Sequence, residues 1–170
     1  MLSAEEIIEL LGLEPLPVEG GHFRETWRSA DELPRHALAH RYGRAKPAGT
    51  AIYYLLTDAP DSFSALHRLP TDEVYHFYLG DPVELAMLHP DGRVECITLG
   101  SELLSGQRVQ HVVARSVWQG SRLIRGGRVA LLGTTMAPGF DPQDYEGGRR
   151  EELTARYPGA AGLIAALTRE

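Results

Sequence analysis

His67 and Glu73 are the two side chains of this sequence best placed to do chemistry together. They lie on successive predicted strands separated by a Pro-Thr-Asp turn. Because side chains alternate along a strand, His67 shares a face with Leu69, and Glu73 shares a face with Tyr75 and Phe77. An imidazole and a carboxylate enclosed among apolar side chains perturb each other and can transfer protons. We therefore predict His67 and Glu73 as candidate catalytic acid–base residues that line a pocket.

Further polar and aromatic side chains could line the same pocket. Arg24 lies in the alternating segment HFRETW, where its guanidinium could bind a carboxylate or phosphate or could lie on a solvated edge. Large aromatic side chains of a sandwich form the core more often than they contact a ligand. With these alternatives open, the predicted ligand-binding residues are Arg24, Tyr53, Tyr75, Phe77, Trp118 and Gln119.

The spacing around His67 resembles the first motif of the cupin superfamily, G-x5-H-x-H-x3-4-E-x6-G. His67 stands at the first histidine, Glu73 at the glutamate, and a glycine closes the motif at the required distance. Leu69 occupies the place of the second histidine. The second cupin motif, P-x-G-x2-H, is similar to the segment ARSVWQ, in which Gln119 takes the place of the histidine.

The resemblance implies a metal held by three histidines and a carboxylate, and the residues here argue against one. Leu69 has no donor atom, and the amide oxygen of Gln119 is a poor ligand for the metals that imidazole favours. Only His67 and Glu73 would remain as ligands, so we expect no tight metal. His76 lies three residues beyond Glu73 on the same predicted strand, so we expect it on the opposite face, in a polar contact or a subunit interface.

A narrower resemblance covers nearly the whole chain. The segments GGHFRETWRS, AIYYLLT, SALHRLPTDEVYHFYLGDPVEL, LHPDG, VWQG and MAPGFDPQDYE follow one another in the order found in the cupin_5 family, a domain of unknown function termed DUF985. This resemblance implies a double-stranded β-helix, the cupin jelly roll, and usually a dimer. It implies no established reaction.

The elements that must position these residues follow from local patterns. Ser3 and Glu6 form a capping box, which predicts a short helix over residues 3–12. Strand patterns recur at short intervals over about residues 20–137, as is typical of an all-β sandwich or barrel. Within that body, residues 30–50 lack a clean period and predict a long exposed loop.

The end of the chain is predicted to be helical. Two helices are expected over about residues 147–168, the first ended by Pro158. The whole chain, residues 1–170, is expected to form a single cupin-like domain, because 170 residues suit one hydrophobic core. The fold class predicted from sequence is thus all-β, with short N-terminal and C-terminal helices.

Composition restricts the kinds of partner. Hydrophobic residues make up 43% of the chain, and the formal net charge of -6 disfavours nucleic acid and anionic membrane surfaces. The single cysteine, Cys96, allows no disulfide within one chain and is consistent with a reducing compartment. The first residues carry glutamates where a signal peptide would be basic and then apolar, so we expect a cytoplasmic protein.

Three functions remain open. The first is a cupin that binds a small polar ligand, sugar-like or anionic, in an interior pocket. The second is an isomerase or epimerase, metal-free or weakly metal-dependent, with His67 and Glu73 as acid and base. The third is a homodimeric structural or interaction protein without a small ligand.

Overall fold

A computed structural model describes residues 2–169, and within them the long strands form two antiparallel sheets that face each other. The larger sheet is built from β1 (Glu14–Pro15), β2 (His22–Arg28), β5 (Thr50–Thr57), β7 (Glu73–Gly80), β10 (Gln110–Val113) and β12 (Val129–Met136). The smaller sheet is built from β6 (Ser64–Arg68), β8 (Val83–Leu88), β9 (Val94–Leu99), β11 (Trp118–Leu123) and β13 (Glu146–Gly147). A separate hairpin pairs β3 (Glu32–Leu33) with β4 (Lys46–Pro47).

The strand order shows how segments distant in sequence become neighbours. The larger sheet has the order β1-β2-β5-β12-β7-β10, and the smaller sheet has the order β13-β6-β11-β8-β9. Because successive long strands often alternate between the sheets, turns such as the one between β6 and β7 carry the chain from one sheet to the other. The two strands that bear the predicted acid–base residues therefore face each other across the sandwich. The predicted all-β class is confirmed.

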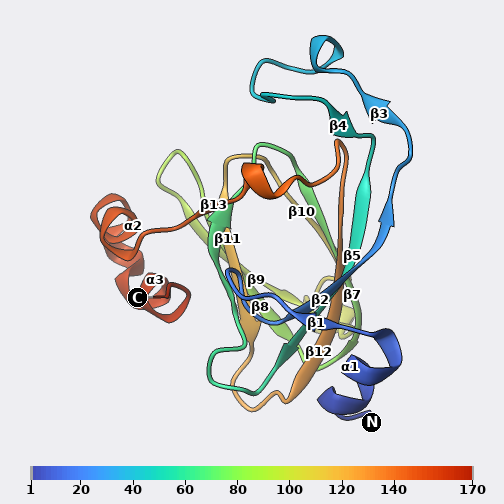
Figure 1. Ribbon diagram of the computed structural model, residues 1–170. Coiled ribbons are helices and arrows are strands. Elements are labelled where there is room, and N and C mark those ends of the chain that lie inside the picture. The colour runs from blue at the N-terminus through green and yellow to red at the C-terminus, as the bar shows by residue number, and fades with distance from the viewer. Residues whose placement is uncertain (1, 170) are drawn as a thin grey trace.

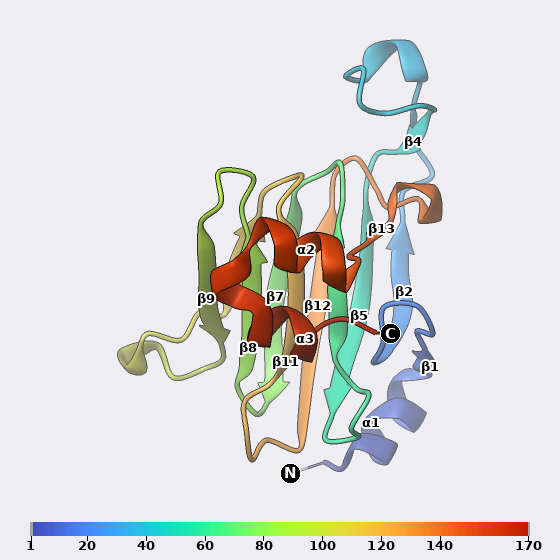
Figure 2. The same cartoon turned by 90° about the vertical axis from the view of Figure 1, so that its left-hand side faces the viewer.

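Short helices flank the sheets near both ends of the chain. Helix α1 (Ala4–Leu11) begins with the predicted capping box: the Glu6 backbone N–H donates to Ser3 Oγ, and the Ser3 backbone N–H donates to the Glu6 carboxylate. Helices α2 (Arg150–Arg156) and α3 (Ala161–Ala166) lie across the outer face of the smaller sheet, over β8 and β11 (Figure 2). Single 3-10 turns occur at η1 (Arg35–Ala37), η2 (Leu103–Ser105), η3 (Pro142–Asp144) and η4 (Pro158–Ala160). Among the helices of residues 2–169, none is long and apolar enough to cross a membrane.

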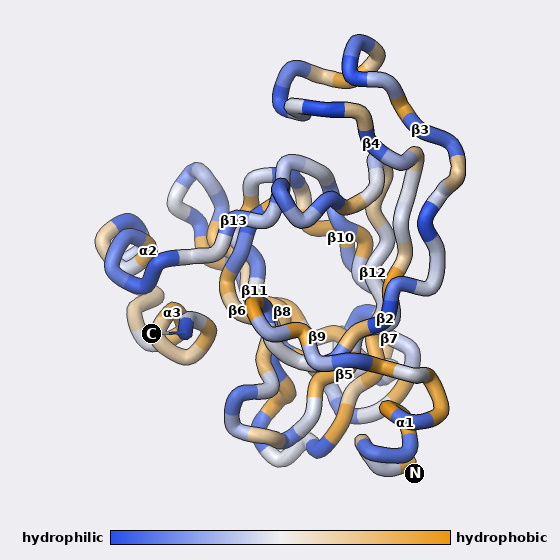
Figure 3. Tube along the Cα trace, viewed as in Figure 1, coloured by the Kyte–Doolittle hydropathy of each residue, from blue (hydrophilic) through white to orange (hydrophobic). Residues whose placement is uncertain are grey.

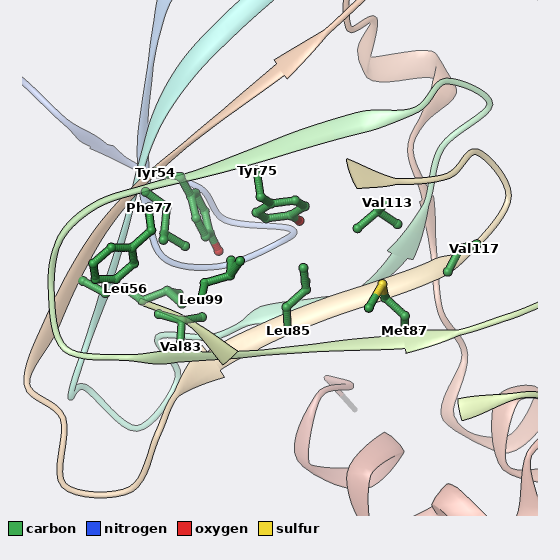
Figure 4. Packing of buried hydrophobic residues seen from close by; sticks show 12 residues of the cluster. Tyr54, Leu56, Tyr75, Phe77, Val83, Leu85, Met87, Leu99, Val113 and Val117 are labelled. Atoms are coloured by element: carbon green, nitrogen blue, oxygen red, sulfur yellow. The ribbon is translucent and has the colours of Figure 1, made fainter. Parts of the chain in front are cut away.

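Hydrocarbon fills much of the space between the sheets. Figure 4 shows Tyr54 and Phe77 of the larger sheet opposite Val83 and Leu85 of the smaller one. Burying such a side chain stabilises the fold by about 1.5–3 kcal/mol relative to leaving it exposed. We call this cluster the inner core, and its members are Tyr54, Leu56, Tyr75, Phe77, Val83, Leu85, Met87, Leu99, Val113, Val117, Ala130 and Leu132.

A hairpin arm, residues 32–47, projects from the body at the end away from helix α1 (Figure 1). Its chain is largely hydrophilic (Figure 3), in keeping with the exposed loop predicted for residues 30–50. The base of the arm differs from that prediction, because Lys46 is completely buried there and forms an ion pair with Asp144. The arm is therefore fastened to the segment that follows β12.

Candidate ligand-binding site

A cavity of about 360 Å³ lies between the two sheets, at the end where β5 and β7 begin and β2, β6 and β12 finish. This volume falls in the range of small-molecule sites, about 300–1,000 Å³. Its apolar lining residues are Leu16, Val18, Phe23, Ile52, Leu69, Met136, Phe140 and Pro142. Its polar lining residues are Glu19, Glu25, Arg28, Thr50, His67, Glu73, Thr134 and Tyr145.

The larger sheet forms its wall from rows of cross-strand partners. One row runs Arg28, Thr50, Met136 and Glu73, and the next runs Glu25, Ile52 and Thr134. Rows two residues apart along a strand face the same side of a sheet. On β2 the two row members, Glu25 and Arg28, are three residues apart. The register shift between Glu25 and Trp27 leaves Thr26 without a partner on β5, which is a β-bulge. This bulge turns Arg28 toward the cavity.

Gln119 joins His67 to Glu73 across the sandwich. His67 and Gln119 are cross-strand partners on the smaller sheet, whereas Glu73 belongs to the larger one. The Gln119 amide nitrogen donates to Glu73 Oε2 at 2.7 Å and lies 3.4 Å from His67 Nε2. The exposed fractions are only 2% for His67 and Gln119 and 7% for Glu73. We call these three side chains the polar cluster.

Hydrogen bonding orients the side chains of the polar cluster. His67 Nδ1 lies 2.8 Å from the backbone oxygen of Ala65, which can only accept, so Nδ1 carries a proton. The Nε2 atom of the same ring faces the Gln119 amide nitrogen. Since the Glu73 carboxylate also only accepts, the amide nitrogen must face it. The amide oxygen, Gln119 Oε1, is left buried without a hydrogen-bond partner among the described residues.

The environment of Glu73 shifts the pKa of its carboxyl group. Burial raises the pKa of its carboxyl group above the ordinary value of 4.5. The attraction of His67 lowers the pKa, the charge of Glu19 raises it, and hydrogen bonds from Thr134 and Gln119 lower it without cancelling the effect of burial. A carboxyl group that keeps its proton nearer to neutral pH can serve as a general acid.

The segment after β12 closes one side of the cavity. We call residues 140–147 the strap, because they run past the mouth and pair with β6 through β13. The Tyr145 ring stacks on the His67 imidazole, with 5.0 Å between ring centroids and 20° between the planes. Burial raises the pKa of the Tyr145 phenol well above its usual value, so this hydroxyl stays protonated.

Buried charge fastens the strap to the hairpin arm. The Lys46 ammonium group is completely buried and pairs with Asp144, while Asp141 lies 3.8 Å away. Arg44 also reaches Asp141, at 3.0 Å. Lys46 further lies over the ring of Tyr42, with 5.9 Å to its centroid. These contacts set the position of the strap, and thereby of the ring that covers His67.

The structure places two predicted ligand-binding residues outside the cavity, and these predictions are corrected. Arg24 and Tyr53 are cross-strand partners on the outer face of the larger sheet, one residue out of phase with the inward-facing Phe23. Arg24 Nη1 donates to the Leu11 backbone oxygen at the end of helix α1, at 2.8 Å. Tyr53 packs edge-on against Tyr78, with 6.0 Å between ring centroids.

Three further aromatic residues do not line the cavity either. Tyr75 and Phe77 face the interior, as the alternation of β7 requires, but they belong to the inner core. Trp118 faces the helices that cover the outer side of the smaller sheet, and the Arg68 guanidinium lies over its ring at 4.6 Å. Its neighbour Gln119 therefore faces inward, where it holds His67 and Glu73 rather than forming part of the open lining.

Sequence reasoning missed Glu19, Arg28 and Tyr145. Tyr145 lies in the segment MAPGFDPQDYE, one of the segments on which the family resemblance rests, so that match could have indicated it. Arg28 ends the strand that contains Arg24, and alternation alone assigns the two arginines to the same face. Glu19 precedes a glycine pair in a loop, where no periodicity applies.

A metal of the kind that the cupin fold implies does not fit this site. A cation near His67 Nε2 and Glu73 would meet the N–H groups of Gln119, which are donors, and Leu69 supplies no ligand atom. His76 cannot complete the set, because it faces outward and its Nε2 lies 3.1 Å from Thr135 Oγ1, the predicted polar contact. No group of three or more His, Cys, Asp or Glu side chains within residues 2–169 could hold a metal.

Two facing antiparallel sheets with an interior cavity and a polar cluster on its wall are an arrangement found in cupins. The cupin 2 domain-containing protein from Halorhodospira halophila shares this fold, with a TM-score of 0.54 at 15% identity over 89% of this chain and 84% of its own. The family model described as Cupin superfamily (DUF985) matches residues 5–147, so the chain belongs to the Cupin_5 family.

Three proteins that are similar in sequence match most of the chain. The structure of a hypothetical protein from Leishmania major is 30% identical, with a TM-score of 0.87 over 99% of this chain and all of that one. Protein SO0799 from Shewanella oneidensis is 31% identical, with a TM-score of 0.84 over 99% of both chains. The uncharacterized protein YML079W of Saccharomyces cerevisiae is 27% identical over 135 residues, which are 75% of this chain and 66% of the yeast protein. The alignment thus spans just under two thirds of that relative's length.

Proposed function

We propose that this cupin binds a small organic molecule in the cavity between its sheets, with the polar cluster as the anchor. One observation carries the proposal: buried hydrogen-bonding side chains stand at the wall of a cavity that is otherwise lined mainly by hydrocarbon. Such sites hold the apolar body of a ligand by burial and fix its orientation through a few polar groups. His67 and Glu73 support this, because both are buried polar side chains that line the cavity.

A screen followed by cavity filling tests this proposal. Sugars, nucleotides, organic acids and amines are tested by thermal shift, and each hit is measured again by calorimetry. We expect hits to lose affinity in Leu69→Trp, whose indole would occupy the cavity, and to keep it in Val94→Trp, a substitution at an exposed site on β9. Hits that bind Leu69→Trp unchanged, or a screen without any hit, would contradict the proposal.

Acid–base catalysis is a second candidate, favoured by the pairing of His67 with Glu73. An imidazole whose Nε2 atom faces the Gln119 amide and a carboxyl group of raised pKa are joined through that amide, and both line the cavity. An isomerase or epimerase removes a proton beside a carbonyl with one group and returns a proton with another. In that role His67 is the base and Glu73 the acid.

Deuterium exchange tests the catalytic candidate. Any carbonyl-bearing ligand found in the screen is incubated with the protein in heavy water, and incorporation at the carbon beside the carbonyl is followed by NMR. We expect incorporation with the wild-type protein and none above background with His67→Ala. Incorporation that continues at the wild-type rate in His67→Ala would remove His67 as the base.

A homodimer is the third proposal, and it is compatible with both others. The outer face of the larger sheet carries exposed apolar side chains on three strands, with exposed fractions of 50% for Trp27, 50% for Tyr78 and 51% for Val112. Apolar groups gathered on one face are typical of association surfaces. We expect light scattering to report a dimer at micromolar concentration and Val112→Lys to shift it toward monomer. A wild-type monomer would contradict this proposal.

A further inference from the structure

The charges that line the cavity do not balance. Three carboxylates face it, from Glu19, Glu25 and Glu73, against the one guanidinium of Arg28. No lysine lines it. The composition of the wall therefore favours positive charge in whatever enters the cavity.

The guanidinium of Arg28 is already occupied. Its Nε and Nη2 atoms donate to the two carboxylate oxygens of Glu25, at 2.9 and 2.7 Å, and its Nη1 donates to the Phe140 backbone oxygen at 3.2 Å. This two-point pairing neutralises Glu25 and uses the geometry with which an arginine would hold an anionic ligand. An anion that entered the cavity would have to displace Glu25.

Among residues 2–169, the Glu19 and Glu73 carboxylates accept hydrogen bonds from neutral side chains and from no cation. Ser64 Oγ donates to Glu19 at 2.7 Å, and the Gln119 amide donates to Glu73 at 2.7 Å. Neither carboxylate forms an ion pair with any side chain within residues 2–169. The Arg169 guanidinium lies outside the lining, where it donates to backbone oxygens that include that of Glu19.

A further feature of the wall suits a nitrogen cation. The aromatic residues Phe23, Phe140 and Tyr145 line the cavity, and aromatic faces attract ammonium groups. Carboxylates and aromatic rings together match a ligand whose polar end donates hydrogen bonds and carries positive charge.

We infer that the cavity takes an amphiphilic amine, with the ammonium group held between the carboxylates of Glu19 and Glu73 and the hydrocarbon part against the apolar lining. The inference rests on the proposed function, since it names the chemical class of ligand for the same cavity. It departs from the sugar-like or anionic ligand expected from the sequence. A cation beside Glu73 also offsets the cost of burying that carboxylate, which is the cause of its raised pKa.

Three probes with the same six-carbon chain test the inference: hexylamine, hexan-1-ol and hexanoate. Binding at pH 7.5 is followed by calorimetry and by NMR shifts of the backbone amides of Leu69, Glu73 and Met136, which report on the cavity. We expect hexylamine to bind about tenfold more tightly than hexan-1-ol and hexanoate to be weakest, because only the amine gains a buried charge pair. Hexanoate that binds as tightly as hexylamine would overturn the inference and leave the proposed function standing. The absence of cavity shifts with all three probes would overturn both.

A matched pair of variants separates charge from structure. Glu19→Gln removes a lining carboxylate, and Glu14→Gln removes an exposed one on β1 that does not line the cavity. We expect Glu19→Gln to weaken hexylamine binding about tenfold with little change for hexan-1-ol, and Glu14→Gln to change neither. An equal loss for amine and alcohol in Glu19→Gln would show that Glu19 acts on the shape of the cavity rather than through its charge, and the inference would fall.

Discussion

The inner core and the cavity are built from the same strands and differ in what those strands place inside. On β5, Thr50 and Ile52 line the cavity, whereas Tyr54 two residues further belongs to the inner core. On β7 the inward series begins with Glu73 and continues with core aromatic residues. One face of each strand therefore changes from polar to apolar within a single strand length.

This difference shows how one sandwich supports both a fold and a site. The side chains of the inner core fill the space between the sheets at the density of a protein interior and hold the sheets together. The side chains that line the cavity leave about 360 Å³ open. They include buried polar groups, whose burial costs free energy that the rest of the fold must offset. Substitutions in the core should therefore affect stability strongly, while substitutions in the cavity should affect stability less and ligand binding more.

The largest contrast is expected between two leucines, one in each region. Leu85→Ala in the inner core should lower the free energy of unfolding by about 3–5 kcal/mol, because a rigid core leaves a new void. Leu69→Ala at the cavity should cost about 2 kcal/mol, since it enlarges a space that already exists. Urea denaturation measures both values. Equal losses would contradict the distinction between a packed core and an open cavity.

The strap should open when its buried cation is removed. Lys46→Met leaves the Asp144 carboxylate without its partner, and the loss of one member of a buried pair costs about 3 kcal/mol or more. Because the pair holds the strap to the arm, we expect amide exchange in residues 140–147 to rise about 100-fold. The control is Arg44→Met, whose partly exposed pair with Asp141 should matter much less. Unchanged exchange in the strap of Lys46→Met would contradict this fastening.

Glu73 should make the free energy of unfolding depend on pH. Its pKa in the folded protein is raised above 4.5, so the folded protein holds the proton more tightly than the unfolded chain. The stabilisation is therefore complete below pH 4.5 and is lost as pH rises through the raised value. Glu73→Gln cannot lose a proton, and its amide could donate to Gln119 Oε1, so the variant should be about 1 kcal/mol more stable than wild type at neutral pH.

The check is the difference in unfolding free energy between Glu73→Gln and wild type, measured from pH 4 to pH 8. We expect this difference to grow with pH and then reach a plateau. A difference that is constant across this range would show that the Glu73 carboxylate is not strained by burial.

The sequence was sufficient for the fold and for placing two side chains, His67 and Glu73, at the cavity. Order and spacing of whole segments identified the family, and the alternation of β6 and β7 placed His67 and Glu73 on facing walls. Both steps depend on local patterns, which can be recognised in the sequence without knowledge of tertiary contacts. The capping box of helix α1 was predicted for the same reason.

The rest of the site depends on contacts that no local pattern encodes. The bulge at Thr26 decides which arginine of β2 faces the cavity, and nothing in HFRETWR marks the extra residue. Tyr75 and Phe77 share the inward face with Glu73, but where the cavity ends and the core begins is set by the opposite sheet. Lys46 appears in an apparent loop and is buried only because a strap about 100 residues later brings it a carboxylate.

The two arginines of β2 give the smallest and most specific test of the comparison. Arg28→Gln frees the Glu25 carboxylate at the mouth, so we expect hexylamine to bind a few-fold more tightly, an effect that weakens with salt because the pair is partly exposed. Arg24→Gln removes the same charge from the outer face and should leave this affinity unchanged. Stability should change by only about 0.5 kcal/mol or less in Arg28→Gln, since exposed ion pairs contribute little. Calorimetry measures the hexylamine affinity of both variants. Equal effects of the two substitutions would contradict the placement of Arg28 and Arg24 on opposite faces of the sheet.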